Sequence, residues 1–432
     1  MELKIGSNGR FLAKDDGAPF FWLADTAWEL FHRLTKEETK EYLATRASQQ
    51  FTVIQAVALA EFYGLTEPNA YGRVPLQKNK EGNFDPCLPD LDQTHGAYTY
   101  WHHVDFVVDT AGSLGLFVGL LPTWGDKFNL KWGKETEIFT PENAAVYGEW
   151  IGGRYKDREN IIWIMGGDRP LENDTHRAVV KNMAEAIKRS THGRHLMTYH
   201  PMGGMSSSEQ LHGEPWLDFN MIQSSHGAGI ISNYEFVQRD YAKEPIKPTL
   251  DGEPRYEDHP AGFKPENGYF DDFDVRVAAY YSMLSGALGH TYGNHSIWSF
   301  NREKQPYFPL LWRDALRRPG AEHMKHLKEL FMARPFLELA PCQELLAENY
   351  PGANYIAAAK GKNYAYLYTP NGLDIKVNTA MLDENRIASY WYDPRNGRYY
   401  VGGMQKNDGT GIFSPPSSGK NNDWVLVLEW GM

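Results

Sequence analysis

The chain has 432 residues, 42% of them hydrophobic and 23% charged, so it is long enough for a large catalytic domain plus a smaller one and does not have a disordered composition. Its 55 acidic and 44 basic residues give a net charge of −11, which opposes binding to nucleic acid and to anionic membranes. The N-terminal segment lacks the apolar stretch of a signal peptide or membrane span, so we expect a cytoplasmic protein.

Short apolar runs alternate with longer amphipathic stretches over the first 300 residues. This alternation is typical of parallel β-strands connected by α-helices. Eight runs are predicted strands: residues 20–23, 51–57, 116–121, 161–165, 195–200, 219–222, 247–250 and 289–292. Because eight strands are the number that closes a (β/α)8 barrel, the sequence predicts a TIM barrel.

Helix signals lie between these runs. Thr35 is followed three residues later by Glu38, as in a capping box, and Thr140 is followed by Pro141, which suits the first position of a helix. Further helices are predicted at 101–114, 175–191, 233–241, 273–285 and 321–339. The last of these is expected to complete the barrel.

The pattern changes after about Pro341. Short alternating segments at 355–359, 364–368, 387–392 and 424–428 are separated by turn sequences such as PNG and PRNG. They predict a small antiparallel β-sandwich. We therefore expect a barrel domain at 1–341 and a β-sandwich domain at 342–432.

Active sites of TIM barrels lie at the C-terminal ends of the strands, so polar and aromatic residues that follow each run are candidates for substrate binding. Sugars need many hydrogen-bonding partners and aromatic faces, and 14% of the residues are aromatic. The predicted substrate-binding residues are Asp25, Trp28, Gln55, Trp124, His200, Gln223, His226, Tyr256, Asn294, His295 and Trp298; Glu61 and Asp126 also lie in these segments.

Two carboxylates are the predicted catalytic pair. Asp168, in IIWIMGGDRP, follows the fourth run, and Glu253, in KPTLDGEPRYE, follows the seventh, which lies across the barrel mouth. A separation of about 5–5.5 Å between their carboxyl groups would suit a retaining glycosidase, and about 6.5–9.5 Å an inverting one. We favour Glu253 as nucleophile and Asp168 as acid/base.

Neighbouring residues in these motifs are also assigned roles. Arg255 and Tyr256 are expected to help keep Glu253 ionised. Gly166 and Gly167 are expected to admit the substrate close to the backbone. The GGD sequence departs from the Asn-Glu pair that many barrel glycosidases carry at this position.

Other classes of site are not indicated. Cys87 and Cys342 are far apart, and neither H-x-H nor H-E-x-x-H occurs, so we expect no metal and no other cofactor. No glycine-rich phosphate loop and no G-x-S-x-G nucleophile motif are found. We expect a small carbohydrate as the partner, with no nucleic acid or membrane, and assign no oligomeric state.

Six ordered motifs, FFWLADTAWELFHRLTKEE, VIQAVALAEFYG, LPTWGDK, IIWIMGGDRP, MIQSSHG and DGEPRYE, resemble the apiosidase-like glycoside hydrolase family over about residues 10–340. The resemblance implies a (β/α)8 barrel that releases apiose, a branched pentose, from plant-derived side chains or glycosides, with Asp168 and Glu253 as its catalytic pair. The tail, with YWYDPRNGRYY, resembles the small domain, labelled collagen-binding, that follows these barrels. Because no leader sequence is recognised, we expect the substrates to be small imported glycosides rather than polymers.

Three functions therefore remain open. The first is an exo-acting, retaining glycosidase that removes one terminal sugar. The second is an endo-acting, glucanase-like hydrolase, which would need an open cleft with several aromatic subsites. The third is a non-catalytic carbohydrate-binding protein whose carboxylates bind sugar hydroxyls.

Overall fold

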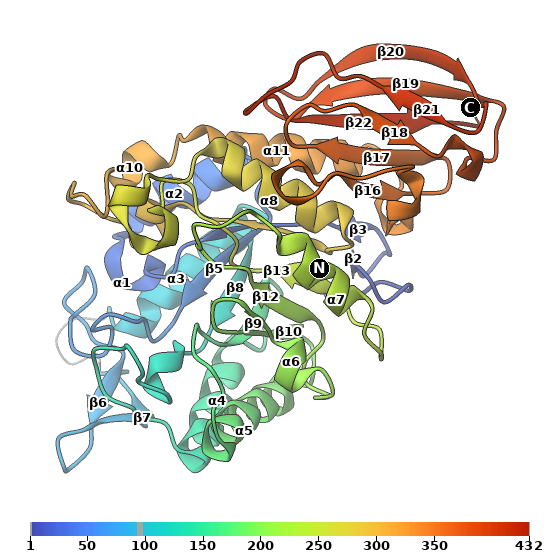
Figure 1. Ribbon diagram of the computed structural model, residues 1–432. Coiled ribbons are helices and arrows are strands. Elements are labelled where there is room, and N and C mark those ends of the chain that lie inside the picture. The colour runs from blue at the N-terminus through green and yellow to red at the C-terminus, as the bar shows by residue number, and fades with distance from the viewer. Residues whose placement is uncertain (1, 93–97, 432) are drawn as a thin grey trace.

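A computed structural model describes residues 2–92 and 98–431 and shows two parts, a barrel and a smaller sheet domain (Figure 1). Eight parallel strands form the barrel, and each overlaps one of the eight predicted runs. They are β4 (Trp22–Thr26), β5 (Val53–Val57), β8 (Phe117–Leu121), β9 (Ile161–Gly166), β10 (Met197–His200), β12 (Asn220–Gln223), β13 (Thr249–Asp251) and β14 (Gly289–Tyr292). Most of their side chains are buried on both faces, which explains why they read as continuous apolar runs.

The barrel is nearly closed. Its strands follow the order β10-β9-β8-β5-β4-β14-β13-β12, and β4 pairs in parallel with β14, where Asp25 is opposite Tyr292. The parallel ladder does not continue between β10 and β12, where Thr198 Oγ1 instead donates a hydrogen bond to the carbonyl oxygen of Phe219. A short strand, β11 (Met205–Ser206), pairs antiparallel with β12 at this point.

The first barrel strand lies further along the chain than predicted. Residues 20 and 21 are apolar, but β3 (Pro19–Phe20) belongs to a separate small sheet with β1 (Leu3–Ile5) and β2 (Leu12–Lys14). The barrel strand then begins at Trp22 and includes Asp25. Asp25 is consequently a strand residue, with its side chain on the face covered by helices.

Helices surround the barrel as predicted. The long ones are α2 (Lys36–Ser48), α3 (Tyr100–Ser113), α4 (Pro141–Tyr155), α5 (Asp174–Ser190), α7 (Asn233–Tyr241), α8 (Asp272–Leu284) and α11 (Pro319–Met332). Thr35 and Glu38 form the predicted capping box of α2, and Thr140 caps α4 with Pro141 in its first turn. Helix α11 ends at Met332 rather than near residue 339, because Pro335 cannot continue a helix.

Shorter helices lie in the connections. Single-turn α-helices are α1 (Leu30–Arg33), α6 (Ser208–Leu211), α9 (His295–Trp298) and α10 (Trp312–Ala315). Turns of 3₁₀-helix occur at Gly125–Lys127, Ala261–Phe263, Pro265–Asn267, Phe336–Glu338, Gln343–Leu345, Gly352–Asn354 and Thr379–Met381.

The C-terminal domain is the predicted antiparallel β-sandwich. One sheet has six strands, in the order β15 (Ala340–Pro341), β16 (Ala357–Lys360), β17 (Tyr364–Thr369), β22 (Trp424–Glu429), β19 (Arg386–Asp393) and β20 (Arg398–Lys406). The other consists of β18 (Ile375–Val377) and β21 (Gly411–Phe413). Leu367, Ile375, Phe413 and Leu426 contribute to a separate buried core within this domain.

The two domains share a packed interface on the helical side of the barrel. Helix α8 contacts β16 and β17, and the rings of Tyr280 and Tyr368 stack with their centroids 4.7 Å apart. Arg276 on α8 donates two 3.0 Å hydrogen bonds to Asp423. In Figure 1 the sandwich accordingly lies beside α8 and α11.

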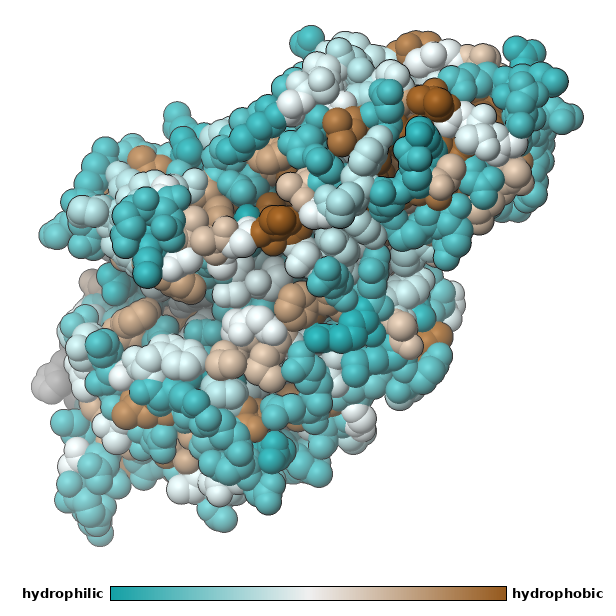
Figure 2. All heavy atoms as spheres, viewed as in Figure 1, coloured by the Kyte–Doolittle hydropathy of each residue, from teal (hydrophilic) through white to brown (hydrophobic). Residues whose placement is uncertain are grey.

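The visible outer surface is mostly hydrophilic, with small and separate apolar areas (Figure 2). Across the described residues, no helix combines the length and apolar character needed to cross a membrane.

Candidate active site

A cavity of about 460 Å³ opens at the C-terminal ends of the barrel strands, a volume suited to a small ligand. Carboxylates, imidazoles and many aromatic rings line it. The lining residues are Trp28, Glu61, Phe62, Trp124, Trp132, Asp168, Met202, Gly203, Gln223, Ser225, His226, Glu253, Tyr256, His259, Phe263, Trp298 and Tyr307. We call this cavity the catalytic pocket.

Glu253 lies just after β13, between two histidines from neighbouring strand ends. Its Oε1 atom accepts a 3.0 Å hydrogen bond from Nε2 of His226. Nε2 of His200 lies 2.9 Å from the other oxygen, although that contact is less well aligned. Burial by itself raises the pKa of Glu253, but the two histidines outweigh it and hold this pKa below the usual range of a glutamate. Glu253 is therefore a buried, ionised carboxylate.

Asp168 follows β9 in a tight turn. Its φ of 49° lies in the left-handed region, and the two preceding glycines also have positive φ values. Its Oδ1 atom accepts a 3.3 Å hydrogen bond from the backbone N–H of Gly203. Burial and the nearby charge of Glu253 raise the pKa of Asp168 to about 6. Asp168 can therefore hold or release a proton near neutral pH.

The glycines before Asp168 have a different role from the one predicted. A Cβ atom on Gly166 would lie 2.5 Å from the ring of Tyr199, and one on Gly167 would lie 2.8 Å from the ring of Trp124. The protein itself fills the space beside both glycines, so they serve close packing of the turn rather than entry of a substrate.

An ion-pair network connects Asp168 with Arg169 and Glu61. The guanidinium of the fully buried Arg169 donates a 2.6 Å hydrogen bond to Glu61 and lies 3.4 Å from Oδ2 of Asp168. It also lies 4.3 Å from the ring centroid of Trp132. Burial raises the pKa of Glu61 to about 7 despite this partner, so a third titratable carboxylate lines the pocket.

Arg255 does not contact Glu253, contrary to the prediction that it keeps this carboxylate ionised. Its Nη1 atom lies 3.4 Å from Asp274, and its Nη2 atom donates to the carbonyl oxygen of Gly227. The histidines take the role that the sequence assigned to the arginine.

The pocket brings together six of the predicted substrate-binding residues: Trp28, Trp124, Gln223, His226, Tyr256 and Trp298. The rings of Trp28 and Trp124 lie 5.2 Å apart and form one wall. Nε1 of Trp124, Oε1 of Gln223 and Nδ1 of His226 are buried and have no hydrogen-bond partner within the part of the chain that the structure describes.

The other five predicted residues do not line the pocket. Asp25 accepts hydrogen bonds of 2.6 Å from Arg46 and Tyr42, on the helical side of β4. Gln55 spans the barrel interior and donates to the carbonyl oxygen of Gly252, the residue before Glu253. His200 reaches the site through its contact with Glu253.

Asn294 and His295 lie behind the pocket wall. Asn294 caps α9 by accepting from Ser296 N and donates a 2.8 Å hydrogen bond to Asp258. His295 stacks on Phe308 and meets the ring of His259 edge-on. Both residues thereby fix the start of α9, the short helix that ends at Trp298.

Several pocket residues were not predicted. Phe62, Trp132, Phe263 and Tyr307 come from loops distant from one another in the sequence, and His259 stacks on His226 at 4.2 Å. Their one signal in the sequence is the occurrence of aromatic residues within long polar loops. No three or more His, Cys, Asp or Glu side chains are grouped to hold a metal ion in residues 2–92 and 98–431.

Comparisons with known proteins identify the family of each domain. The family model "Apiosidase-like, catalytic domain" matches residues 6–338, and the model "Putative collagen-binding domain of a collagenase" matches residues 340–429. No curated protein matches the chain.

Solved structures resemble the whole chain. A structure described as a glycoside hydrolase is 32% identical with a TM-score of 0.90, and the match covers 100% of this chain and 97% of that one. A glycoside hydrolase family 5 structure from Bacteroides vulgatus ATCC 8482 is 31% identical with a TM-score of 0.90, covering 99% and 93%. An endo-1,4-beta-D-mannanase from Thermotoga petrophila RKU-1 shares the fold. It is 14% identical with a TM-score of 0.51, and the match covers 72% of this chain and 100% of that one.

Proposed function

Because the chain belongs to the apiosidase-like family of glycoside hydrolases, we propose that it removes a terminal sugar, apiose in the first instance, from plant-derived glycosides or oligosaccharides by an exo-acting, retaining mechanism. The observation that carries the proposal is Glu253, a buried ionised carboxylate that shares an aromatic-walled pocket with Asp168, a carboxyl group of raised pKa. Two carboxyl groups with pKa values pushed apart by their surroundings are the usual requirement for glycoside hydrolysis.

Glu253 is the proposed nucleophile. A nucleophile must be ionised before it attacks the anomeric carbon, and the hydrogen bond from His226 together with the contact from His200 maintains that state. A carboxylate can only accept hydrogen bonds, so each histidine must present its protonated Nε2 atom towards Glu253. Both contacts fix the orientation of the carboxylate.

Asp168 is the proposed acid/base. Part of the increase in its pKa comes from the charge on Glu253, so Asp168 is protonated at pH values below about 6 and can then protonate the leaving oxygen. When Glu253 bonds to the sugar, its negative charge disappears and the pKa of Asp168 falls. Asp168 can then accept a proton from the attacking water, as the second step of a retaining reaction requires.

The walls of the pocket support a sugar substrate. Trp28, Trp124, Tyr256 and Trp298 offer ring faces for the C–H surfaces of a sugar. The carboxyl groups of Glu61 and Asp168 line the same pocket and can accept hydrogen bonds from sugar hydroxyl groups.

The proposal is tested with a panel of 4-nitrophenyl glycosides, apiosides included, on the wild type, Glu253→Gln and Asp168→Asn. We expect hydrolysis of an apioside and a loss of at least about 10³-fold in kcat/KM in each variant. Near-normal rates in both variants would refute the assignment. Proton NMR of the first-formed anomer distinguishes retention from inversion.

A further inference from the structure

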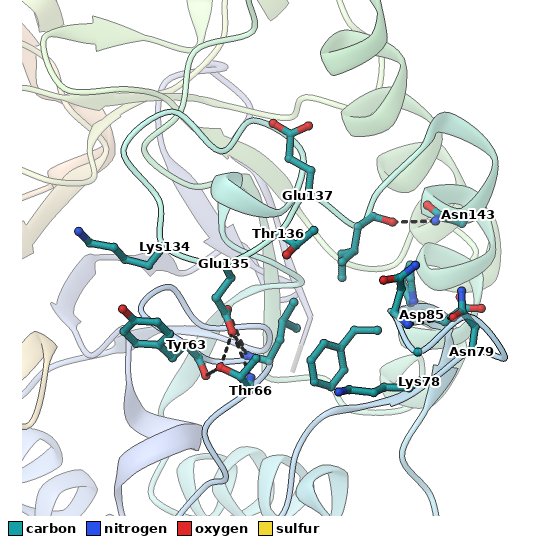
Figure 3. Close-up of a pocket in the computed structure, with 16 residues that line it drawn as sticks. Tyr63, Thr66, Lys78, Asn79, Asp85, Lys134, Glu135, Thr136, Glu137 and Asn143 are labelled. Carbon is teal, nitrogen blue, oxygen red and sulfur yellow. Dashed lines mark hydrogen bonds between the residues drawn. The ribbon is translucent and has the colours of Figure 1, made fainter.

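A second cavity, of about 700 Å³, is walled by the loop after β5, by the hairpin of β6 (Leu76–Lys78) and β7 (Phe84–Pro89), and by the loop after β8 (Figure 3). We propose that this cavity, which we call the hairpin groove, binds the leaving-group side of an oligosaccharide whose terminal sugar occupies the catalytic pocket. The inference rests on the proposed function and extends it. The lining residues are Tyr63, Leu65, Thr66, Lys78, Asn79, Gly82, Asn83, Phe84, Asp85, Pro86, Lys134, Glu135, Thr136, Glu137, Ile138 and Asn143.

The groove and the catalytic pocket are built from the same two loops. Phe62 lines the pocket, and the next residue, Tyr63, lines the groove. Trp132 lines the pocket, and Lys134, two residues further on, lines the groove. In Figure 3, Tyr63 and Lys134 lie together at one end of the groove. A sugar chain that leaves the pocket past Phe62 and Trp132 therefore meets this end first.

The boundary between the cavities is strained. Phe62 and Tyr63 have φ values of 42° and 69°, two consecutive left-handed residues that are not glycine. Such conformations are costly for bulky residues and cluster at ligand-binding sites, where the surrounding structure maintains them. Tyr63 remains 43% exposed, so its ring is not held there by burial in a core. Its ring is available to stack on a sugar.

The floor of the groove is preorganised. Glu135 accepts hydrogen bonds from the backbone N–H groups of Leu65 and Thr66, both at 3.1 Å, and from the hydroxyl of Thr66 at 3.0 Å (Figure 3). Its carboxylate also pairs at 2.9 Å with the fully buried Lys127. The loop after β8 is thereby fixed to the loop after β5. Binding a ligand would therefore not carry the entropic cost of ordering these loops.

The lining of the groove matches a hydroxyl-rich ligand. Lys78 and Lys134 line it, and neither forms an ion pair with a described residue. The carboxylates of Asp85 and Glu137 line it as well, and the third lining carboxylate, Glu135, is paired with the buried Lys127, so positive and negative groups balance. This mixture of donors and acceptors suits a sugar chain better than a polyanion, which would need a cationic surface, or an apolar aglycone.

The hairpin forms one wall of this groove. The connection from β5 to α3 covers residues 58–99, far longer than the few residues that are usual between a strand and its helix. Long loops of this kind in TIM barrels usually carry binding function. Lys78, Phe84 and Asp85 of the hairpin all line the groove.

The test compares two substrates with the same terminal sugar. One is 4-nitrophenyl apioside, whose leaving group is a single ring, and the other is an uncharged apiosylated oligosaccharide of three or more sugars. We expect Tyr63→Ala and Lys134→Ala to lower kcat/KM for the oligosaccharide about tenfold, and for 4-nitrophenyl apioside by less than about twofold. The control is Lys80→Ala, because Lys80 is an exposed lysine of the same hairpin that does not line the groove. Equal losses on both substrates, or no loss on the oligosaccharide, would overturn the inference.

A binding measurement separates this inference from the proposed function. The same oligosaccharide without its apiose is added to the wild type, and saturation-transfer NMR detects binding in the groove. We expect transfer in the wild type and in Lys80→Ala, and its loss in Tyr63→Ala. If the wild type hydrolyses no apioside, the proposed function fails while this binding still supports the groove; absence of transfer in the wild type would overturn the groove itself.

Discussion

His226 donates a 3.0 Å hydrogen bond from Nε2 to Oε1 of Glu253, and its other ring nitrogen has no protein partner in the described residues. One imidazole that lines the catalytic pocket thus contacts the proposed nucleophile directly. The ring is held by His259, which stacks on it at 4.2 Å, and by Tyr256 at 4.4 Å. Glu253 is therefore positioned by a packed aromatic cluster.

Removal of this hydrogen bond should change the pH dependence of the reaction. His226 lowers the pKa of Glu253, so His226→Ala is expected to raise that pKa and to move the acidic limb of the kcat/KM profile to higher pH. At the optimum we expect a loss of about 10²-fold, because the carboxylate also loses its orientation. The control is His192→Asn, because His192 is exposed and outside the pocket. An acidic limb that does not move would contradict the role of His226.

The raised pKa of Asp168 predicts that the site lowers the stability of the protein. The folded-state pKa of about 6 lies above the ordinary value of 3.8. The contribution of this carboxyl group to the free energy of unfolding is therefore fully present below pH 3.8 and is lost as pH rises through about 6. Asp168→Asn carries no charge and should be more stable than the wild type by up to about 3 kcal/mol at pH 8, with the difference vanishing near pH 4.

Urea unfolding at the two pH values measures this effect. Asp383 is an exposed aspartate remote from the pocket, and Asp383→Asn is expected to respond to pH as the wild type does. A gain in Asp168→Asn that is equal at pH 4 and pH 8 would show that the ionisation of Asp168 is not its cause.

Most of the fold could be predicted from the sequence because barrel strands are buried on both faces and appear as short apolar runs. The first strand was placed too early because Phe20 and Phe21 are also apolar, although Phe20 belongs to a separate sheet. This shift matters for Asp25. Within a strand, successive side chains alternate between faces, so an error in where the strand ends changes which face a residue occupies.

The site was predictable only in part. Asp168 and Glu253 follow strands, and their order along the chain was enough to place both at the barrel mouth. The contacts that determine their pKa values were not predictable. His200, His226 and Arg169 lower these pKa values because of their distances from the two carboxyl groups, and a sequence does not give distances between side chains. Arg255 is adjacent to the motif of Glu253 in sequence, yet its guanidinium reaches Asp274. Proximity in sequence does not give the direction of a side chain.

Arg169 should determine the basic limb of the pH profile. Its charge lowers the pKa values of both Asp168 and Glu61, so Arg169→Met is expected to raise them. Because the reaction needs protonated Asp168, activity in the wild type should decline as pH rises through about 6, and the variant should retain its activity to higher pH. The pH dependence of kcat/KM for an aryl glycoside measures this change. The control is Arg177→Met, because Arg177 lies on α5 and pairs with the exposed Asp174. If the basic limb of Arg169→Met fell at the same pH as that of the wild type, the role of Arg169 would be refuted.

The interface between the domains should depend on the pair Arg276 and Asp423. Both side chains are almost fully buried, and Asp423 also accepts a 3.0 Å hydrogen bond from Tyr368. Asp423→Ala leaves the guanidinium buried with only Asp272 as a charged partner, so we expect a loss of about 3 kcal/mol in the free energy of unfolding. Asp408→Ala is the control, because the exposed pair of Asp408 with Lys406 should contribute less than about 1 kcal/mol.

The double variant Arg276→Met with Asp423→Leu distinguishes an unpaired charge from lost packing. It removes both charges and keeps apolar volume at the interface, so it should recover much of the stability that Asp423→Ala loses. Urea unfolding followed by tryptophan fluorescence measures all four proteins. If the double variant were as unstable as Asp423→Ala, the uncompensated charge of Arg276 would not be the cause, and the domains would depend on the shape of the interface around Tyr280 and Tyr368 instead.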